Sequence, residues 1–213
     1  MCSWFCSGWW FCFAADRSSI GTTSVTTAHA KDHRKNIACL ESLWNSDIEN
    51  RLSVVPILEL VCKINRIKYT YLTCNTREEL GYNLGKLNSR RGYRILYLSL
   101  HGKPGEIILD GGRTDLETLA TMMGTRFAGW AVHFGSCSTI AVPPRRLRRF
   151  IAATKVAIVL GYETDVNWIA SAALDLLLFD WFQYYSDTRR LWKDFRRKNA
   201  GLIAQTGLKA FHA

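Results

Sequence analysis

A histidine and a cysteine, two residue types that can act together in nucleophilic catalysis, each follow a dense apolar run in this chain. His101 follows the run at 95–100, and Cys137 follows the run at 130–134 after one glycine and one serine. Each run has the composition of a β-strand that is buried on both faces. Ligand sites of open parallel sheets collect beyond the carboxyl ends of the strands, and neighbouring strands lie about 5 Å apart. We therefore expect His101 and Cys137 to meet at one sheet edge if these strands are parallel neighbours.

A thiol beside an imidazole is the smallest set of groups for cysteine-nucleophile chemistry. The cysteine attacks only as a thiolate, and histidine is a base near neutral pH without a large change of its pKa. Gly135, Ser136 and Ser138 are small enough to let a substrate backbone approach Cys137. The backbone N–H groups of Gly102 and Cys137 could form an oxyanion hole. Chance also places a histidine and a cysteine at strand ends, so these residues alone leave catalysis open.

The first half of the chain alternates between strand and helix patterns. We expect strands at 37–40, 68–74 and 95–100, with helices at 54–64 and from 76 to about 87. Asn75 or Thr76 can cap the second helix. This alternation favours right-handed βαβ units, and therefore an α/β fold with a mostly parallel sheet and helices on both faces.

The second half adds a hairpin and five further elements besides the strand before Cys137. The strand at 106–109 and the tight turn at 110–112 can close a hairpin, and Thr114 or Asp115 can cap a helix at 116–123. The remaining expected elements are a helix opened by the prolines at 143–144, a strand at 155–160, an apolar helix at 166–185 and a basic helix from 187 to about 205. A helix that is apolar nearly all round is usually buried or shared with a partner.

Three regions follow from composition. Residues 1–36 combine an uncharged, aromatic and Cys-rich start with a polar stretch that has no period, so we expect a disordered extension. An alternative is an anchor at a membrane surface through its Trp and Phe side chains. Residues 37–185 form the α/β domain, and 186–213 form a basic C-terminal helix that packs on or extends it. No segment has the length and composition of a transmembrane helix.

The distribution of charge and the cysteine spacing indicate which partners, metal sites and cellular compartment are expected. The net charge of +10 comes from 143–155 and 186–213, so it is local and most simply a solvated helix face. None of the seven cysteines has CxxC spacing, so neither a zinc site nor a thioredoxin motif is indicated. A domain of this size with an ample core needs no disulfide framework. We expect a reducing, cytoplasmic setting, no metal and no cofactor.

Four segments together resemble the caspase-like cysteine peptidases of clan CD. They are LSLHG at 98–102, ILDG at 108–111, TDLE at 114–117 and VHFGSCST at 132–139. The pattern is closest to the CHAT branch, in which a strand runs into His-Gly, a hairpin leads to a helix, and a second strand runs into Ser-x-Cys. The resemblance covers about residues 93–165, and the flanking pattern extends it to 37. The chain is also similar to small bacterial proteins known only as a domain of unknown function.

The resemblance implies a three-layer α/β/α caspase-like sandwich and a cysteine endopeptidase that works through an acyl-enzyme. His101 and Cys137 fall on the catalytic positions, and Gly102 falls on the oxyanion position. A polypeptide is then the substrate, and the pocket for its P1 side chain sets the specificity.

The residues of the P1 pocket are harder to predict. Asp165 and Glu163 follow the next strand at the same sheet edge and would favour a basic P1 side chain. Asp165 could instead cap the following helix, and Arg94 or Arg113 could serve an acidic P1 side chain. A further histidine, at position 133, lies in the strand before Cys137 at a distance of about 13 Å, so we expect a core histidine there rather than a catalytic base.

Two other functions compete with the peptidase. The first is a catalytically inactive caspase-like interaction module, which uses the helix at 166–185 to form a homodimer or to bind a regulatory protein. The second is a nucleic-acid accessory protein that binds through the basic residues at 145–149 and 189–198, with an affinity that falls steeply with salt. Because the basic residues are confined to two segments, we consider nucleic acid the less favoured partner.

Overall fold

In the computed structural model of the chain, the structure describes residues 33–45, 47, 49, 51–87 and 90–213. The expected disorder of residues 1–32 therefore lies outside the described residues. Residues 33–36, which we assigned to the extension, belong to the folded domain: the Lys35 ammonium donates hydrogen bonds to the carbonyls of Phe182 and Tyr185 at 2.8 and 2.7 Å. The His33 N–H also donates to the Gln183 carbonyl at 3.0 Å, so the domain includes at least His33.

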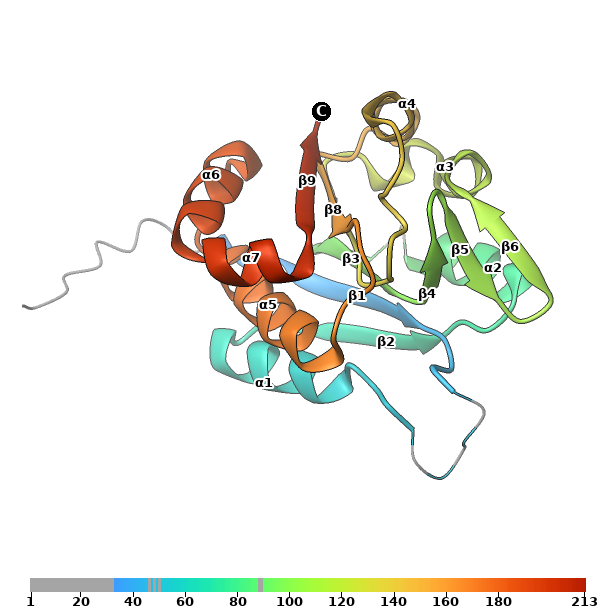
Figure 1. The fold of residues 1–213 in the computed structure, drawn as a ribbon, viewed down its shortest axis with the longest axis horizontal. Coiled ribbons are helices and arrows are strands. Elements are labelled where there is room, and N and C mark those ends of the chain that lie inside the picture. Colours follow the sequence, from blue (N-terminus) through green and yellow to red (C-terminus); the bar gives the residue numbers. More distant parts are fainter. Residues whose placement is uncertain (1–32, 46, 48, 50, 88–89) are drawn as a thin grey trace, which may run out of the picture.

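A six-stranded sheet forms the centre of the fold (Figure 1). Its order is β2-β1-β3-β7-β8-β9, and every neighbouring pair is parallel except β8 with β9. The strands are β1 (Asn36–Glu41), β2 (Tyr69–Thr73), β3 (Tyr93–Ser99), β7 (Ala131–Phe134), β8 (Ile158–Tyr162) and β9 (Leu208–His212). The predicted mostly parallel sheet is confirmed.

Helices cover both faces of the sheet, which gives the expected three-layer α/β/α sandwich (Figure 1). One face carries α2 (Arg77–Leu87), α3 (Leu116–Met123) and α4 (Pro144–Thr154), with the short 3-10 helix η1 (Gly124–Phe127) after α3. The other face carries α1 (Val55–Asn65), α5 (Trp168–Trp181), α6 (Thr188–Lys198) and α7 (Ala200–Thr206).

The inner strands are mostly apolar because they contribute to two cores. In β3, Ile95 and Tyr97 pack toward α1 and α5, whereas Leu96 and Leu98 pack toward α2 and α3. This alternation is the side-chain geometry of a strand with helices on both sides. The expected doubly buried strands are therefore present.

Local capping residues start the helices as expected. Thr76 accepts a hydrogen bond from the Glu79 N–H at 3.2 Å, and the Glu79 carboxylate accepts one from the Thr76 N–H at the same distance. This reciprocal pair is a capping box. Asp115 caps α3 by accepting from the Thr118 N–H at 2.7 Å, and α4 begins at Pro144.

The expected hairpin is part of a second, three-stranded antiparallel sheet. It consists of β4 (His101–Lys103), β5 (Glu106–Leu109) and β6 (Gly112–Asp115). We did not predict β4, which begins at His101 and pairs this residue with Ile108. His101 therefore sits where the chain leaves the central sheet and enters the small one.

The C-terminal region differs most from the expectation. Residues 186–213 form no single basic helix: α6 ends at Lys198, α7 follows, and Leu208–His212 form strand β9 at the edge of the central sheet. The segment is therefore part of the α/β domain. The apolar helix is also shorter than 166–185, and Asn167 rather than Asp165 caps α5 through bonds from the N–H groups of Ile169 and Ala170.

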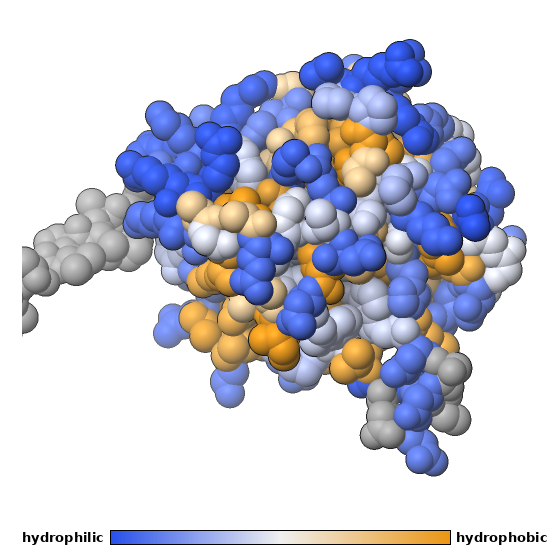
Figure 2. Space-filling model, in the orientation of Figure 1, coloured by the Kyte–Doolittle hydropathy of each residue, from blue (hydrophilic) through white to orange (hydrophobic). Residues whose placement is uncertain are grey.

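The surface in Figure 2 is mostly hydrophilic, with hydrophobic area over α1 and α5. Ile64 on α1 is 66% exposed and Ile169 on α5 is 73% exposed. Across the part of the chain that the structure describes, no helix is long and apolar enough to cross a membrane.

The buried thiols give the fold a predictable pH dependence. Burial raises the pKa of Cys62 and of Cys74 from 9.0 to about 12 and raises that of Cys39 well above 9.0. Unfolded thiols ionise near pH 9 and folded ones do not, so this stabilisation is complete below pH 9 and is lost as the pH rises toward 12. We expect the free energy of unfolding, measured with denaturant, to fall between about pH 9 and pH 12.

The control is a Cys62→Ala, Cys74→Ala double variant. It should be less stable than wild type at pH 8 because it has cavities, but its stability should fall less steeply with pH. An equally steep fall in the variant would contradict the assignment to the thiols.

Candidate active site

The two residues singled out by type, His101 and Cys137, line one cavity. Strands β3 and β7 are parallel neighbours, with Leu98 opposite Phe134. His101 and Cys137 each lie three residues beyond this pair, and both border a cavity of about 200 Å³ at the carboxyl edge of the sheet. The structure therefore brings together the groups that the sequence placed at two separate strand ends.

Aromatic and aliphatic side chains form most of the cavity wall. They come from the loop after β1, from α1, from β3 and from the start of α5. The apolar members are Trp44, Val54, Ile57, Tyr97, Val166, Trp168 and Ala172, and the polar side chains besides His101 are Ser99, Ser171 and Asp175. Trp44 and Trp168 meet edge to face with their ring centroids 5.0 Å apart.

The imidazole of His101 is oriented by the loop after β1. Its Nε2 lies 3.1 Å from the backbone carbonyl oxygen of Trp44, and the Trp44 ring packs edge-on against it at 5.0 Å. A carbonyl only accepts hydrogen bonds, so Nε2 carries a proton. In the neutral ring, Nδ1 is then the basic nitrogen.

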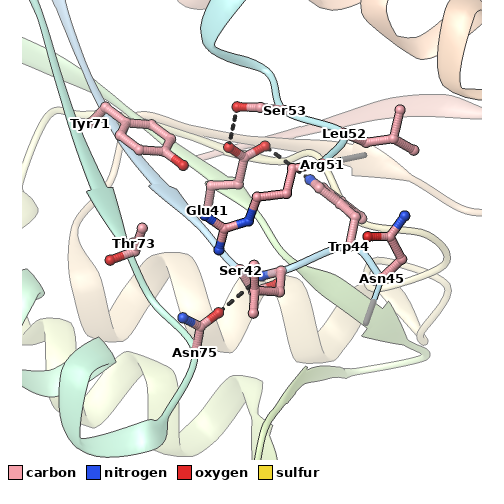
Figure 3. Close-up of a pocket in the computed structure, with 11 residues that line it drawn as sticks. Glu41, Ser42, Trp44, Asn45, Arg51, Leu52, Ser53, Tyr71, Thr73 and Asn75 are labelled. Atoms are coloured by element: carbon pink, nitrogen blue, oxygen red, sulfur yellow. Dashed lines mark hydrogen bonds between the residues drawn. The ribbon is translucent and has the colours of Figure 1, made fainter. Parts of the chain in front are cut away.

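The loop that carries Trp44 is held by a buried carboxylate, Glu41, at the end of β1. Glu41 is 3% exposed. It accepts hydrogen bonds from Trp44 Nε1 at 2.9 Å, from the Ser53 hydroxyl at 2.6 Å and from the Val54 N–H at 2.8 Å. Figure 3 shows the bonds of Glu41 to Trp44 and Ser53, which border a second pocket of about 220 Å³. Sequence analysis missed this role; the only signal was a carboxylate at the end of a buried strand.

Cys137 is half-buried in a tight loop that is bonded on both sides. Ser138 has a positive φ of 55°. Its N–H donates to the Thr164 carbonyl at 3.2 Å, and its hydroxyl donates to Asp165 at 3.0 Å. A further hydrogen bond of 2.7 Å, between the hydroxyls of Ser136 and Thr139, spans Cys137. The loop that carries the thiol is therefore held by hydrogen bonds within it and to the turn after β8.

Two glycines allow the His101 and Cys137 segments to approach each other. A Cβ at Gly102 would lie 2.6 Å from the Cys137 carbonyl oxygen, and a Cβ at Gly135 would lie 2.5 Å from the Tyr97 ring. Both distances are below van der Waals contact, so a side chain at either position would push the two halves of the site apart. Whether the N–H groups of Gly102 and Cys137 bind an oxyanion stays a prediction.

The two acids expected in the P1 pocket are engaged elsewhere. Glu163 forms an ion pair with Lys209 of β9, and Asp165 accepts the hydroxyl of Ser138. Among the described residues, neither is part of the wall of the cavity that His101 and Cys137 share. The arginines offered as alternatives, Arg94 and Arg113, do not line it either.

The acid that lines the cavity is Asp175, and it forms the centre of a buried polar cluster. Asp175 is 2% exposed. It accepts hydrogen bonds from Tyr97 at 2.6 Å and from Tyr162, and it lies 2.6 Å from Nε2 of His133. Burial and the charge of Asp175 raise the pKa of both tyrosines well above 10, so the tyrosines stay protonated donors.

His133 is fully buried in this cluster. It stacks on Tyr97 with ring centroids 5.3 Å apart, and it is not part of the cavity wall. The expected core histidine is therefore confirmed, with Asp175 as its partner. The sequence showed Asp175 only as a charge that interrupts an apolar helix, because its three partners lie on strands far away in the chain.

The fold and the site define an α/β/α domain with a histidine and a cysteine at the carboxyl ends of adjacent parallel strands. The chain belongs to a family of unknown function, DUF6642, whose model matches residues 34–212. A search of curated proteins finds no match. The matched region includes the whole central sheet and both residues.

Removing the charge of Glu41 should loosen the loop that orients His101. In a Glu41→Gln variant, only one amide oxygen remains to accept from three donors. Leaving a buried donor unsatisfied costs about 1–3 kcal/mol, and we expect the free energy of unfolding to fall by that amount. Denaturant titration measures it, with the exposed Glu59→Gln as a matched control that should change nothing. Equal stability of both variants would show that Glu41 does not hold the loop that carries Trp44.

Proposed function

We propose that the protein is a cysteine endopeptidase of the caspase-like, CHAT type, with Cys137 as the nucleophile and His101 as the general base. The observation that carries the proposal is that both residues line one cavity at the ends of adjacent parallel strands. The carbonyl of Trp44, bonded to Nε2 of His101, supports it because it leaves Nδ1 free to take a proton.

The proposed reaction needs His101, Cys137 and one water molecule. Nδ1 of His101 accepts the proton of the Cys137 thiol, and the thiolate attacks the carbonyl carbon of the peptide bond. The tetrahedral oxyanion needs donors that are in place beforehand. The intermediate collapses as the amine leaves with the proton from His101, and a water then hydrolyses the thioester with His101 again as the base. The products are two shorter peptides and the regenerated thiol.

Two further features support the proposal. The four segments that resemble caspase-like peptidases form, in order, the end of β3, the hairpin, the start of α3 and the Cys137 loop. The described cysteines at 39, 62, 74 and 137 are all free thiols, which suits the reducing, cytoplasmic setting that we propose. Of these four, Cys137 is the one that is not buried.

The test is alkylation of Cys137 by iodoacetamide across pH, followed by peptide mass spectrometry in a Cys2→Ser, Cys6→Ser, Cys12→Ser background. We expect Cys137 to react well below pH 8 and His101→Ala to slow the reaction there by about 10²-fold or more, the usual contribution of a positioned base. Cys137→Ala should remove the label.

The matched control is His33→Ala, which changes a histidine that does not line the cavity of His101 and Cys137. This variant should leave the rate of Cys137 alkylation unchanged. A Cys137 thiol that reacts only above pH 8, with the same rate in His101→Ala, is an ordinary thiol. That result would contradict the peptidase proposal.

A second candidate function is a catalytically inactive interaction module that forms a homodimer. The observation that favours it is the exposed apolar area on the helix layer, where Leu60, Ile64 and Ile169 are 48%, 66% and 73% exposed. Surface patches of this kind mark interaction sites when they are contiguous. A second copy of the chain would cover the same patch on both subunits.

Sedimentation velocity tests this alternative. A dimer of wild type that becomes a monomer in Ile64→Lys, but stays a dimer in the adjacent exposed Lys63→Gln and in Cys137→Ala, would favour the module. A wild-type monomer at all concentrations would remove it.

A further inference from the structure

The wall of the cavity that His101 and Cys137 line also includes a buried carboxylate. Asp175 lines the same cavity as Cys137 and His101, although it lies on α5 and is 2% exposed. Among the described residues, its ion-pair partner is His133, and no lysine or arginine pairs with it. The charge state of His133 therefore decides the charge of the cluster.

The hydrogen bonds favour neutral His133. Its Nδ1 is buried and has no hydrogen-bond partner, whereas Nε2 bonds to Asp175. In the cation, Nδ1 would be a buried, charged N–H without an acceptor, and leaving such a donor unsatisfied costs more than leaving a lone pair unused. With His133 neutral and both tyrosines protonated, the cluster of Asp175, His133, Tyr97 and Tyr162 has a net charge of −1.

A second polar group in the cavity also lacks a partner. Ser99 is fully buried, its hydroxyl makes no hydrogen bond, and it lines the cavity together with Asp175. A buried polar atom without a partner is unusual in folded proteins. Its position in the wall provides a group that a polar ligand can bond to.

The remaining wall suits a long side chain with a charged end. Trp44, Trp168 and Tyr97 contribute aromatic rings, which attract cations at their faces and cover aliphatic stems. The volume of about 200 Å³ is smaller than the range of about 300–1,000 Å³ that is typical of pockets for drug-sized ligands. The cavity therefore suits one side chain rather than an extended ligand.

We propose that this cavity receives a lysine or arginine side chain of the polypeptide substrate, next to the bond that is cleaved, with Asp175 as the counter-charge. The inference rests on the proposed peptidase function and names the substrate class for that site. In this proposal the acid that selects a basic P1 side chain is Asp175 on α5, in place of Asp165 and Glu163.

Other side chains fit the cavity less well. An acidic side chain would place a second negative charge in a desolvated site, where like charges repel strongly. An apolar side chain would bury the charge of Asp175 and the hydroxyl of Ser99 without offering either a partner, and such unpaired groups are costly. A lysine or arginine offers donors to both.

The experiment compares two peptidyl chloromethylketones that differ only in the P1 side chain, lysine or its uncharged analogue norleucine. Each alkylates the Cys137 sulfur with loss of chloride. We expect wild type to react at least about tenfold faster with the lysine probe, a difference of about 1.4 kcal/mol. Asp175→Asn should bring the ratio of the two rates close to one. Asp180→Asn, on the same helix but outside the cavity wall, should keep the wild-type ratio.

A measurement on wild type alone covers the case in which Asp175→Asn does not fold. Agmatine, a small guanidinium compound, should slow the alkylation of Cys137 by iodoacetamide, and 1-pentanol at the same concentration should not. Equal rates with both chloromethylketones and no protection by agmatine would overturn the inference, even where alkylation depends on His101 and the peptidase proposal stands. Alkylation that ignores His101 overturns the proposed function itself.

Discussion

The buried carboxylate of Asp175 is the interaction on which the centre of the domain depends. It joins α5 to three consecutive strands of the sheet through Tyr97 on β3, His133 on β7 and Tyr162 on β8. The carboxylate is hydrogen-bonded to all three side chains, and a hydrogen bond to a charged group contributes about 1.5–3 kcal/mol. The cluster therefore fixes the register of α5 on the sheet, and with it this part of the cavity wall.

The two halves of the candidate site are held by different parts of the chain. The loop after β1, tied down by Glu41, orients His101, whereas the turn after β8 holds the Cys137 loop through Ser138. Glycines at 102 and 135 remove the side chains that would separate these halves. The positions of His101 and Cys137 relative to each other thus depend on the close approach of their two backbone segments.

Local patterns predicted the strands, the hairpin and the caps of α2 and α3 because each of these depends on neighbours in sequence. The missed features depend on distant partners. Strand β9 has a mixed composition and forms only because β8 offers an open edge, and Asp175 finds its partners on three strands. Glu163 lies at the predicted sheet edge, but Lys209 of that unforeseen strand pairs with its carboxylate. No local pattern contains these pairings.

The position of β9 also connects the Cys137 loop to a distant part of the chain. The segment around β9 holds the turn after β8, since the Gly207 carbonyl accepts from the Glu163 N–H at 3.1 Å and the Thr206 carbonyl accepts from the Thr164 hydroxyl at 3.2 Å. The Thr164 carbonyl in turn holds the loop of Cys137. The backbone that carries Cys137 is therefore held, through the turn after β8, by residues 206 and 207 just before β9. A change in the segment around β9 would reach the Cys137 loop without touching either the cysteine or its neighbours in the chain.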